Sequence, residues 1–154
     1  MKERTLVIIK PDAINRSLIG EIIHRFEAKG LKIVGMKLVH LSEKELEIHY
    51  AHHKGKKFFP GLIRYMRSAP SLLIVLEGND VVSVVRKMAG PTYGVEAEPG
   101  TIRGDFSMSM QNTIIHASDS VEKAEEEIKR FFKPEEIFEY NRVDSNYIYS
   151  EEER

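Results

Sequence analysis

A histidine at the end of an apolar strand is the residue whose type and position best suit chemistry. His116 lies in the segment NTIIHASDS (112–120), after two isoleucines and before residues that favour helix N-termini. The unpaired N–H groups and the dipole at such a terminus attract negative charge. An imidazole there can accept a phosphoryl group. The simpler interpretation is a histidine that makes a local hydrogen bond at a strand end.

Three cations lie at predicted element ends, where they could bind phosphate. Lys10 ends the first predicted strand, Arg86 borders a valine-rich helix, and Arg103 lies between the glycines of PGTIRGDF (99–106). Glycines let a ligand approach the backbone closely. Each cation alone is more simply a solvated surface charge, and their common position adds modest support for a phosphate clamp.

Three further histidines have the spacing of a helical metal site. His49, His52 and His53 follow one another at i, i+3 and i+4 on a predicted helix. No acidic or cysteine partner is close in the sequence, so we expect a solvated helix face there. The chain also has no Walker loop and no GxGxxG motif.

Composition excludes several classes of protein. The 154 residues contain 23 Lys and Arg against 24 Asp and Glu, which gives no global basic field for nucleic acid or anionic membrane. The absence of cysteine excludes disulfides, thiolate nucleophiles and iron–sulfur clusters. The early apolar run at 6–9 is too short for a signal peptide or a membrane span. We expect one soluble, cytoplasmic domain over residues 1–154.

Hydrophobic spacing predicts a four-stranded α+β protein. Strands are expected at 4–10, 31–41, 71–78 and 114–116, with a bulge at Gly35. Helices are expected between Ser17 and Gly30, from about 43 to 53, at 58–66, from Val81 to just before Gly90, and after Asp119. Ser17 and Asp119 are the expected caps of their helices, and Ser42 with Glu45 forms an expected capping box. Residues 89–113 show no sustained period and are expected as a long functional loop.

This order of elements predicts a ferredoxin-like βαββαβ sandwich, in which helices cover a four-stranded antiparallel sheet. A ferredoxin-like nucleic-acid module is a poor alternative, because strands 4–10 and 71–78 contain no aromatic residue for base stacking.

Seven blocks of the chain resemble the nucleoside diphosphate kinase family, in that family's order. They are ERTLVIIKPDA (3–13), GEIIHRFEAKGLKIVGMK (20–37), HY (49–50), FFPGLIRYMRSAP (58–70), PGTIRGDF (99–106), IHASDS (115–120) and KPEEIFEY (133–140). The resemblance implies reversible transfer of the γ-phosphate from a nucleoside triphosphate to a nucleoside diphosphate. The mechanism would be ping-pong through phosphohistidine at His116, with 89–113 as the nucleotide-binding loop.

The resemblance also assigns roles to residues. The implied catalytic residues are His116, Lys10, Tyr50, Ser118 and Glu127, and the implied nucleotide-binding residues are Lys10, Phe58, Arg86, Thr92, Arg103 and Thr113. Glu127 and Ser118 would orient the imidazole, and Phe58 would stack on the base. Helical spacing alone allows Glu125 as well as Glu127 beside the apolar stripe. The resemblance favours Glu127.

Magnesium and self-association are further implications of the resemblance. Mg²⁺ is expected because it neutralises phosphate oxygens. Its protein ligands stay unassigned, since Asp119 matches the acid near the metal but is also an expected cap. The chain is expected to form a homo-oligomer, a hexamer in preference to a tetramer, with no requirement for nucleic acid or a membrane. Thr113 departs from the family's asparagine, which contacts the ribose.

Two other functions use the same histidine. A histidine phosphocarrier would receive the phosphoryl group from a protein partner, and a nucleotide-binding regulatory domain would bind nucleotide without turnover. Phe58, Arg86 and Arg103 would have no ligand in the phosphocarrier. Nucleotide binding therefore separates it from the kinase.

Overall fold

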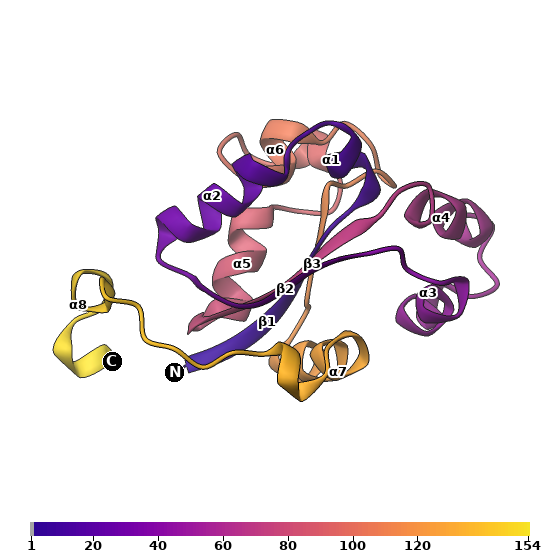
Figure 1. Ribbon diagram of the computed structural model, residues 1–154. Helices are drawn as coiled ribbons and strands as arrows, with labels where there is room; N and C mark the ends of the chain where they lie inside the picture. Colours follow the sequence, from indigo (N-terminus) through magenta and orange to yellow (C-terminus); the bar gives the residue numbers. More distant parts are fainter. Residues whose placement is uncertain (1) are drawn as a thin grey trace.

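Four strands form one antiparallel sheet in the order β2-β3-β1-β4 (Figure 1). The computed structural model describes residues 2–154. The strands are β1 (Lys2–Ile9), β2 (Lys32–Val39), β3 (Ser71–Asn79) and β4 (Ile115–Ala117), and every pairing among them is antiparallel. This order and direction confirm the predicted ferredoxin-like α+β fold.

Helices cover both faces of the sheet. The α-helices are α1 (Pro11–Asn15), α2 (Ile19–Lys29), α3 (Glu43–His49), α4 (Phe59–Met66), α5 (Val81–Ala89), α6 (Ile102–Phe106), α7 (Val121–Phe131) and α8 (Ser145–Ile148). Short 3-10 helices lie at η1 (Ala51–His53), η2 (Gly94–Glu96), η3 (Pro134–Glu136) and η4 (Glu151–Glu153). In Figure 1, α2 and α5 lie over one face of the sheet, and α7 lies over the other. In residues 2–154, no helix combines the length and apolar character that crossing a membrane requires.

The strand β1 belongs to two hydrophobic cores at once. Val7 and Ile9 pack in the core beneath α2 and α5, while Leu6 and Ile8 pack in the core beneath α3, α4 and α7. All four side chains are fully buried. Successive strand residues face opposite sides of a sheet, so a continuous apolar run is what a strand covered on both faces requires.

Local sequence signals predicted several elements well. Ser42 accepts a hydrogen bond from the N–H of Glu45 and receives the reciprocal bond, which confirms the capping box of α3. The register between β2 and β3 shifts between Ile33 and Gly35, which confirms the bulge. The helix expected over 43–53 is α-helical only to His49 and continues after Tyr50 as η1.

Ser17 and Asp119, the two N-caps predicted from single residues, are not the N-caps of their helices. Ser17 has a φ of 58° and ends α1, because its N–H donates to Ile14 O and the next N–H donates to Ala13 O. This pair of bonds is a Schellman motif, which closes a helix. The N-cap of α7 is Ser120, whose side chain accepts from the N–H of Lys123. Asp119 instead pairs with Arg86.

The segment 89–113 is more regular than its composition predicted. It contains η2 and α6, and the side chain of Thr101 caps α6 by accepting from the N–H of Gly104. A Cβ at Gly104 would lie 2.0 Å from the carbonyl oxygen of Glu98. The glycine therefore allows two stretches of backbone to touch, and this contact folds the segment back on itself.

We predict opposite effects for two glycine substitutions. Gly104→Ala should lower the free energy of unfolding by about 1–3 kcal/mol, because the methyl group has no space. Gly20→Ala in α2 should raise it by roughly 0.5–1 kcal/mol, because nothing lies within 4 Å and alanine favours helix. Urea unfolding followed by circular dichroism measures both. Equal effects of the two substitutions would contradict this account of the segment.

Candidate active site

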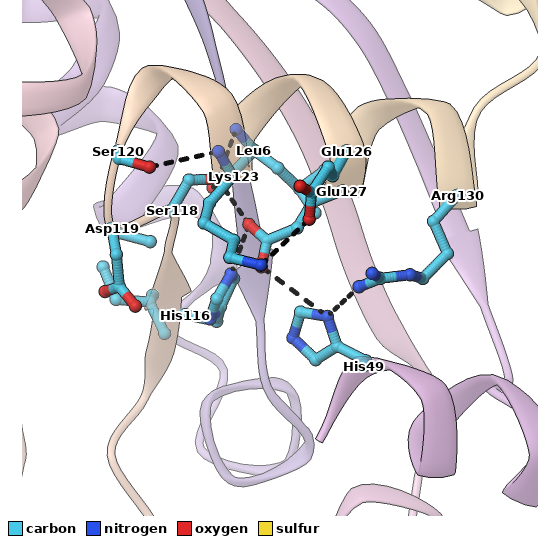
Figure 2. A network of polar contacts seen from close by, with 12 residues as sticks. Leu6, His49, His116, Ser118, Asp119, Ser120, Lys123, Glu126, Glu127 and Arg130 are labelled. Carbon is cyan, nitrogen blue, oxygen red and sulfur yellow. Dashed lines mark hydrogen bonds and ion pairs between the residues drawn. The ribbon is translucent and has the colours of Figure 1, made fainter. Parts of the chain in front are cut away.

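The sheet register places His116 opposite Ile8 of the central strand β1, at the middle of β4 and two residues before the connection to α7. Its Nε2 lies 3.0 Å from Oε1 of Glu127, which α7 presents toward the strand. The hydroxyl of Ser118 donates to the same carboxylate oxygen at 2.6 Å. Figure 2 shows these three side chains converging between β4 and α7.

The strand β4 begins one residue later than predicted, because Ile114 is in the left-handed region with a φ of 71°. Two hydrogen bonds hold this conformation. The N–H of Ile114 donates to Oδ2 of Asp12 at 3.1 Å, and the N–H of Lys10 donates to its carbonyl at 2.9 Å. A left-handed β-branched residue is costly and persists only where its surroundings fix it. The end of β1 thus determines where β4 starts.

Glu127 is the buried charge of the site. Burial would raise the pKa of its carboxyl, but hydrogen bonds from His116 and Ser118 and the nearby imidazoles outweigh burial and lower the pKa to about 2. Glu127 is therefore a carboxylate at neutral pH and can only accept hydrogen bonds. A neutral His116 must then carry its proton on Nε2, which leaves the lone pair on Nδ1.

Lys10, Thr113 and Arg103 form a second, cationic group behind β4. The ammonium of Lys10 donates to Oγ1 of Thr113 at 2.9 Å. Burial, with the charge of Arg103, lowers the pKa of Lys10 to about 8. Lys10 is thus a buried cation whose side-chain hydrogen bond goes to a neutral hydroxyl, and the charge of Asp12 only partly offsets its burial, which suits it to meet an anion.

The guanidinium of Arg103 is buried and holds the backbone together. It donates to the carbonyl oxygens of Gly90, Thr113 and Ile115 at 2.9, 3.1 and 2.7 Å. Burial, with the charge of Arg86, lowers the pKa of Arg103 to about 10. A guanidinium has five N–H groups, so some remain for a ligand after these three bonds.

The remaining predicted residues lie further out. Arg86 donates to Asp119 at 2.6 Å and approaches the carbonyl of Ala117 at 3.5 Å, so it borders β4. Thr92 is exposed and Phe58 is 48% exposed. Within residues 2–154, no hydrogen bond links Thr92 or Phe58 to the other predicted residues.

Tyr50 is buried, and its hydroxyl has no hydrogen-bond partner among the described residues. Burial, with the charge of Glu127, raises its pKa. Its ring lies 4.7 Å from the ring of His49, which in turn lies 4.7 Å from that of His116. Tyr50 thus reaches the histidine through a residue that the sequence did not single out for the site.

That residue, His49, corrects the prediction of a solvated histidine face. Its side chain is buried, with Nδ1 3.7 Å from Oε2 of Glu127 and 3.1 Å from the guanidinium of Arg130 (Figure 2). Burial, with the adjacent His116, lowers its pKa to about 3, so its ring is neutral. The one available signal was its spacing of three residues from Leu46, which faces the core.

The described residues suit a magnesium ion that is held mainly by the phosphates of a bound ligand. Mg²⁺ prefers oxygen ligands and is usually held by one or two carboxylates together with phosphates. Asp119 is the carboxylate closest in sequence to His116, and its side chain is 78% exposed beside Arg86. Across residues 2–154, the one group of three potential metal ligands is nitrogen-rich and contains His49, His116 and Glu127.

The fold and the site define an α+β protein with a carboxylate-oriented histidine facing buried cations, which is an arrangement suited to phosphoryl transfer. A family model described as nucleoside diphosphate kinase matches residues 3–137. The chain belongs to the nucleoside diphosphate kinase family and is therefore a phosphotransferase. The predicted family and enzyme class are confirmed.

Individual relatives agree with this assignment. A nucleoside diphosphate kinase of Thermococcus kodakarensis is 59% identical over 141 residues, which cover 90% of this chain and 81% of that protein. One from Pyrococcus furiosus is 56% identical, covering 99% of this chain and 96% of that protein. The structure of a halophilic nucleoside diphosphate kinase from Halobacterium salinarum in complex with CDP matches with a TM-score of 0.93 and 41% identity, covering 97% and 99% of the two chains.

We predict that the hydroxyl of Thr113 matters for folding because it is the acceptor of a buried ammonium. Thr113→Val removes the partner of Lys10 and should lower the free energy of unfolding by about 1–3 kcal/mol. Thr5→Val is the matched control, since the buried Thr5 hydroxyl has no partner among residues 2–154, and its loss should be neutral or stabilising. Urea unfolding measures both variants. A destabilised Thr5→Val together with an unchanged Thr113→Val would refute the role of Thr113 as the stabilising acceptor of Lys10.

Proposed function

We propose that this chain exchanges the γ-phosphate between nucleoside triphosphates and diphosphates through phosphohistidine at His116. The observation that carries the proposal is the contact between His116 Nε2 and the Glu127 carboxylate. This contact fixes the tautomer in which Nδ1 has the free lone pair, so the nucleophile is ready without a separate base. Ser118 assists by holding the same carboxylate oxygen.

In the first half-reaction, the Nδ1 lone pair attacks the γ-phosphorus as the bond to the bridging oxygen breaks. The nucleoside diphosphate takes that electron pair and leaves. The phosphorylated ring keeps its proton on Nε2 and is positively charged, and Glu127 balances this charge. A second diphosphate then attacks the phosphorus with a terminal oxygen and restores the neutral imidazole.

The cations of the site would hold the phosphates. Lys10 can turn its ammonium from Thr113 to the transferring group, and Arg103 keeps N–H groups that its carbonyl bonds do not use. Arg86 is half exposed and can leave Asp119 for a β-phosphate. Charge that develops during transfer would then meet donors already in place.

The other nucleotide contacts follow the family roles. Thr92 would bind a phosphate, Tyr50 would support the histidine, and the exposed ring of Phe58 would stack on any base. Thr113 would contact the ribose, since its oxygen accepts from Lys10 and its own O–H remains available as a donor.

We further propose magnesium as the cofactor, a homo-oligomer as the assembly and the cytoplasm as the location, with residues 1–154 as one domain. Magnesium would neutralise the phosphate oxygens, and Asp119 would be its nearest carboxylate. The preference for a hexamer over a tetramer rests on the family resemblance alone, whereas exposed apolar side chains on the sheet edge and the nucleotide-binding loop support self-association. They are Met36, Leu38, Met108 and Met110.

We predict that Mg²⁺ and γ-labelled ATP will label His116. The label should be acid-labile, map to His116 by mass spectrometry, and move to added GDP. His116→Asn should abolish labelling, whereas His24→Asn, which changes an exposed histidine of α2, should not. Nucleotide binding without label would instead favour a regulatory domain. Label that only a protein donor supplies would favour a phosphocarrier.

We predict that affinity for ADP falls as the pH rises through about 8. The pKa of Lys10 is lowered to about 8 in the free protein, so its ammonium is present below that pH and is lost above it. Lys10→Met should weaken binding about tenfold or more and remove this step. Lys29→Met changes an exposed lysine and should leave the pH-dependent step in ADP affinity in place. Calorimetry from pH 6 to 10 provides the measurement, and a step that persists in Lys10→Met would assign it to another group.

A further inference from the structure

We propose that His49, His116 and Glu127 form an inhibitory site for a borderline transition-metal ion such as Zn²⁺. One ligand atom of each residue lies within 4.8 Å of the others. Glu127 lies between the two rings, with Oε1 3.0 Å from His116 Nε2 and Oε2 3.7 Å from His49 Nδ1 (Figure 2). The site is separate from magnesium bound on nucleotide phosphates.

The donor set selects the class of metal. Two imidazoles and one carboxylate, with a fourth position open, is a recurrent ligand set for zinc. Tetrahedral zinc with bonds of about 2.0–2.1 Å keeps its ligand atoms about 3.3 Å apart. The 3.0 and 3.7 Å contacts run to the two different oxygens of Glu127, and the three ligand atoms lie within 4.8 Å of one another, so the side chains would draw together slightly around the ion. Magnesium prefers oxygen ligands and would not compete well here.

Both imidazoles can offer a lone pair. The guanidinium of Arg130 donates to His49 Nδ1 at 3.1 Å, so this nitrogen is an unprotonated acceptor, and its lone pair becomes available when Arg130 moves away. His116 needs only to move its proton from Nε2 to Nδ1. The side chain of His116 is 18% exposed, against 10% for Glu127 and 2% for His49, so an ion would reach the site past His116.

Arg130 is the built-in competitor of the metal. Its guanidinium occupies the lone pair of His49 that the ion needs, and it adds positive charge beside the site. Lys10 adds a second positive charge near His49. Arg130 is only half buried, at the last turn of α7, so it can swing into solvent when the ion arrives. Metal affinity is therefore set by the balance between Glu127 and these cations.

Metal binding would switch off the nucleophile, a step that rests on the proposed function. An ion on Nε2 takes the lone pair of that nitrogen, and the displaced proton moves to Nδ1. A protonated Nδ1 has no lone pair with which to attack phosphorus. No redox partner or additional reactant is needed, and removal of the ion restores the original tautomer.

Calorimetry with ZnCl₂ on the full chain, without nucleotide, tests the site. We expect one Zn²⁺ per chain. His49→Phe keeps the ring contacts with Tyr50 and Phe131 but removes a ligand, and should weaken binding about 100-fold. Arg130→Gln should tighten binding several-fold, which a folding defect would not do. His52→Ala tests the pair of the exposed His52 and the partly buried His53, whose rings are 3.9 Å apart, and should not change Zn²⁺ binding.

Zn²⁺ should also slow phosphohistidine formation from Mg-ATP in wild type and much less in His49→Phe. Unchanged Zn²⁺ affinity in both His49→Phe and Arg130→Gln would overturn the site, as would loss of binding in His52→Ala. If Zn²⁺ affinity changes as expected in His49→Phe and Arg130→Gln but Zn²⁺ does not slow phosphorylation, the site stands and its inhibitory role is overturned. Failure of the phosphohistidine function itself appears separately, as absence of label in metal-free wild type.

Discussion

The site depends on the hydrogen bonds that the buried guanidinium of Arg103 donates to the backbone. The guanidinium binds the carbonyl oxygens of Gly90, Thr113 and Ile115, and thereby joins the end of α5, the start of β4 and the helix α6. A buried arginine is stable only when its donors are paired. The residue proposed as a phosphate ligand is therefore also a structural centre, and α6, β4 and the cation lie in fixed relation.

Signals that act within a few residues made much of the fold predictable. The capping box at Ser42 and Glu45, the continuous apolar run of β1 and the glycine after α2 each satisfy hydrogen bonds or burial locally. The same logic failed at Ser17, because a residue between two helices can close the first instead of opening the second. It also failed across 102–106, where glycine masked a helix that Thr101 caps.

The site was predictable only where a motif matched, because its geometry comes from distant elements. Glu127 and Glu125 border the same stripe of α7, and only the packing of α7 on β1 decides that Glu127 faces His116. His49 looked solvated because its cover, Phe131 and Glu127, lies about eighty residues later in the chain. The three-residue spacing of His49 from Leu46 marks a core-facing side, but it does not identify these distant neighbours.

The pairing of β4 with β1 also governs when the site can exist. Ile8 and His116 are neighbours in space although more than a hundred residues separate them in the chain. Contacts of such long sequence separation form late, because a large loop must close first. A growing chain on the ribosome has no oriented histidine until α7 has emerged and Glu127 has docked. Competence in chemistry therefore requires the chain through α7, because the histidine and the carboxylate that orients it come from the last third of the sequence.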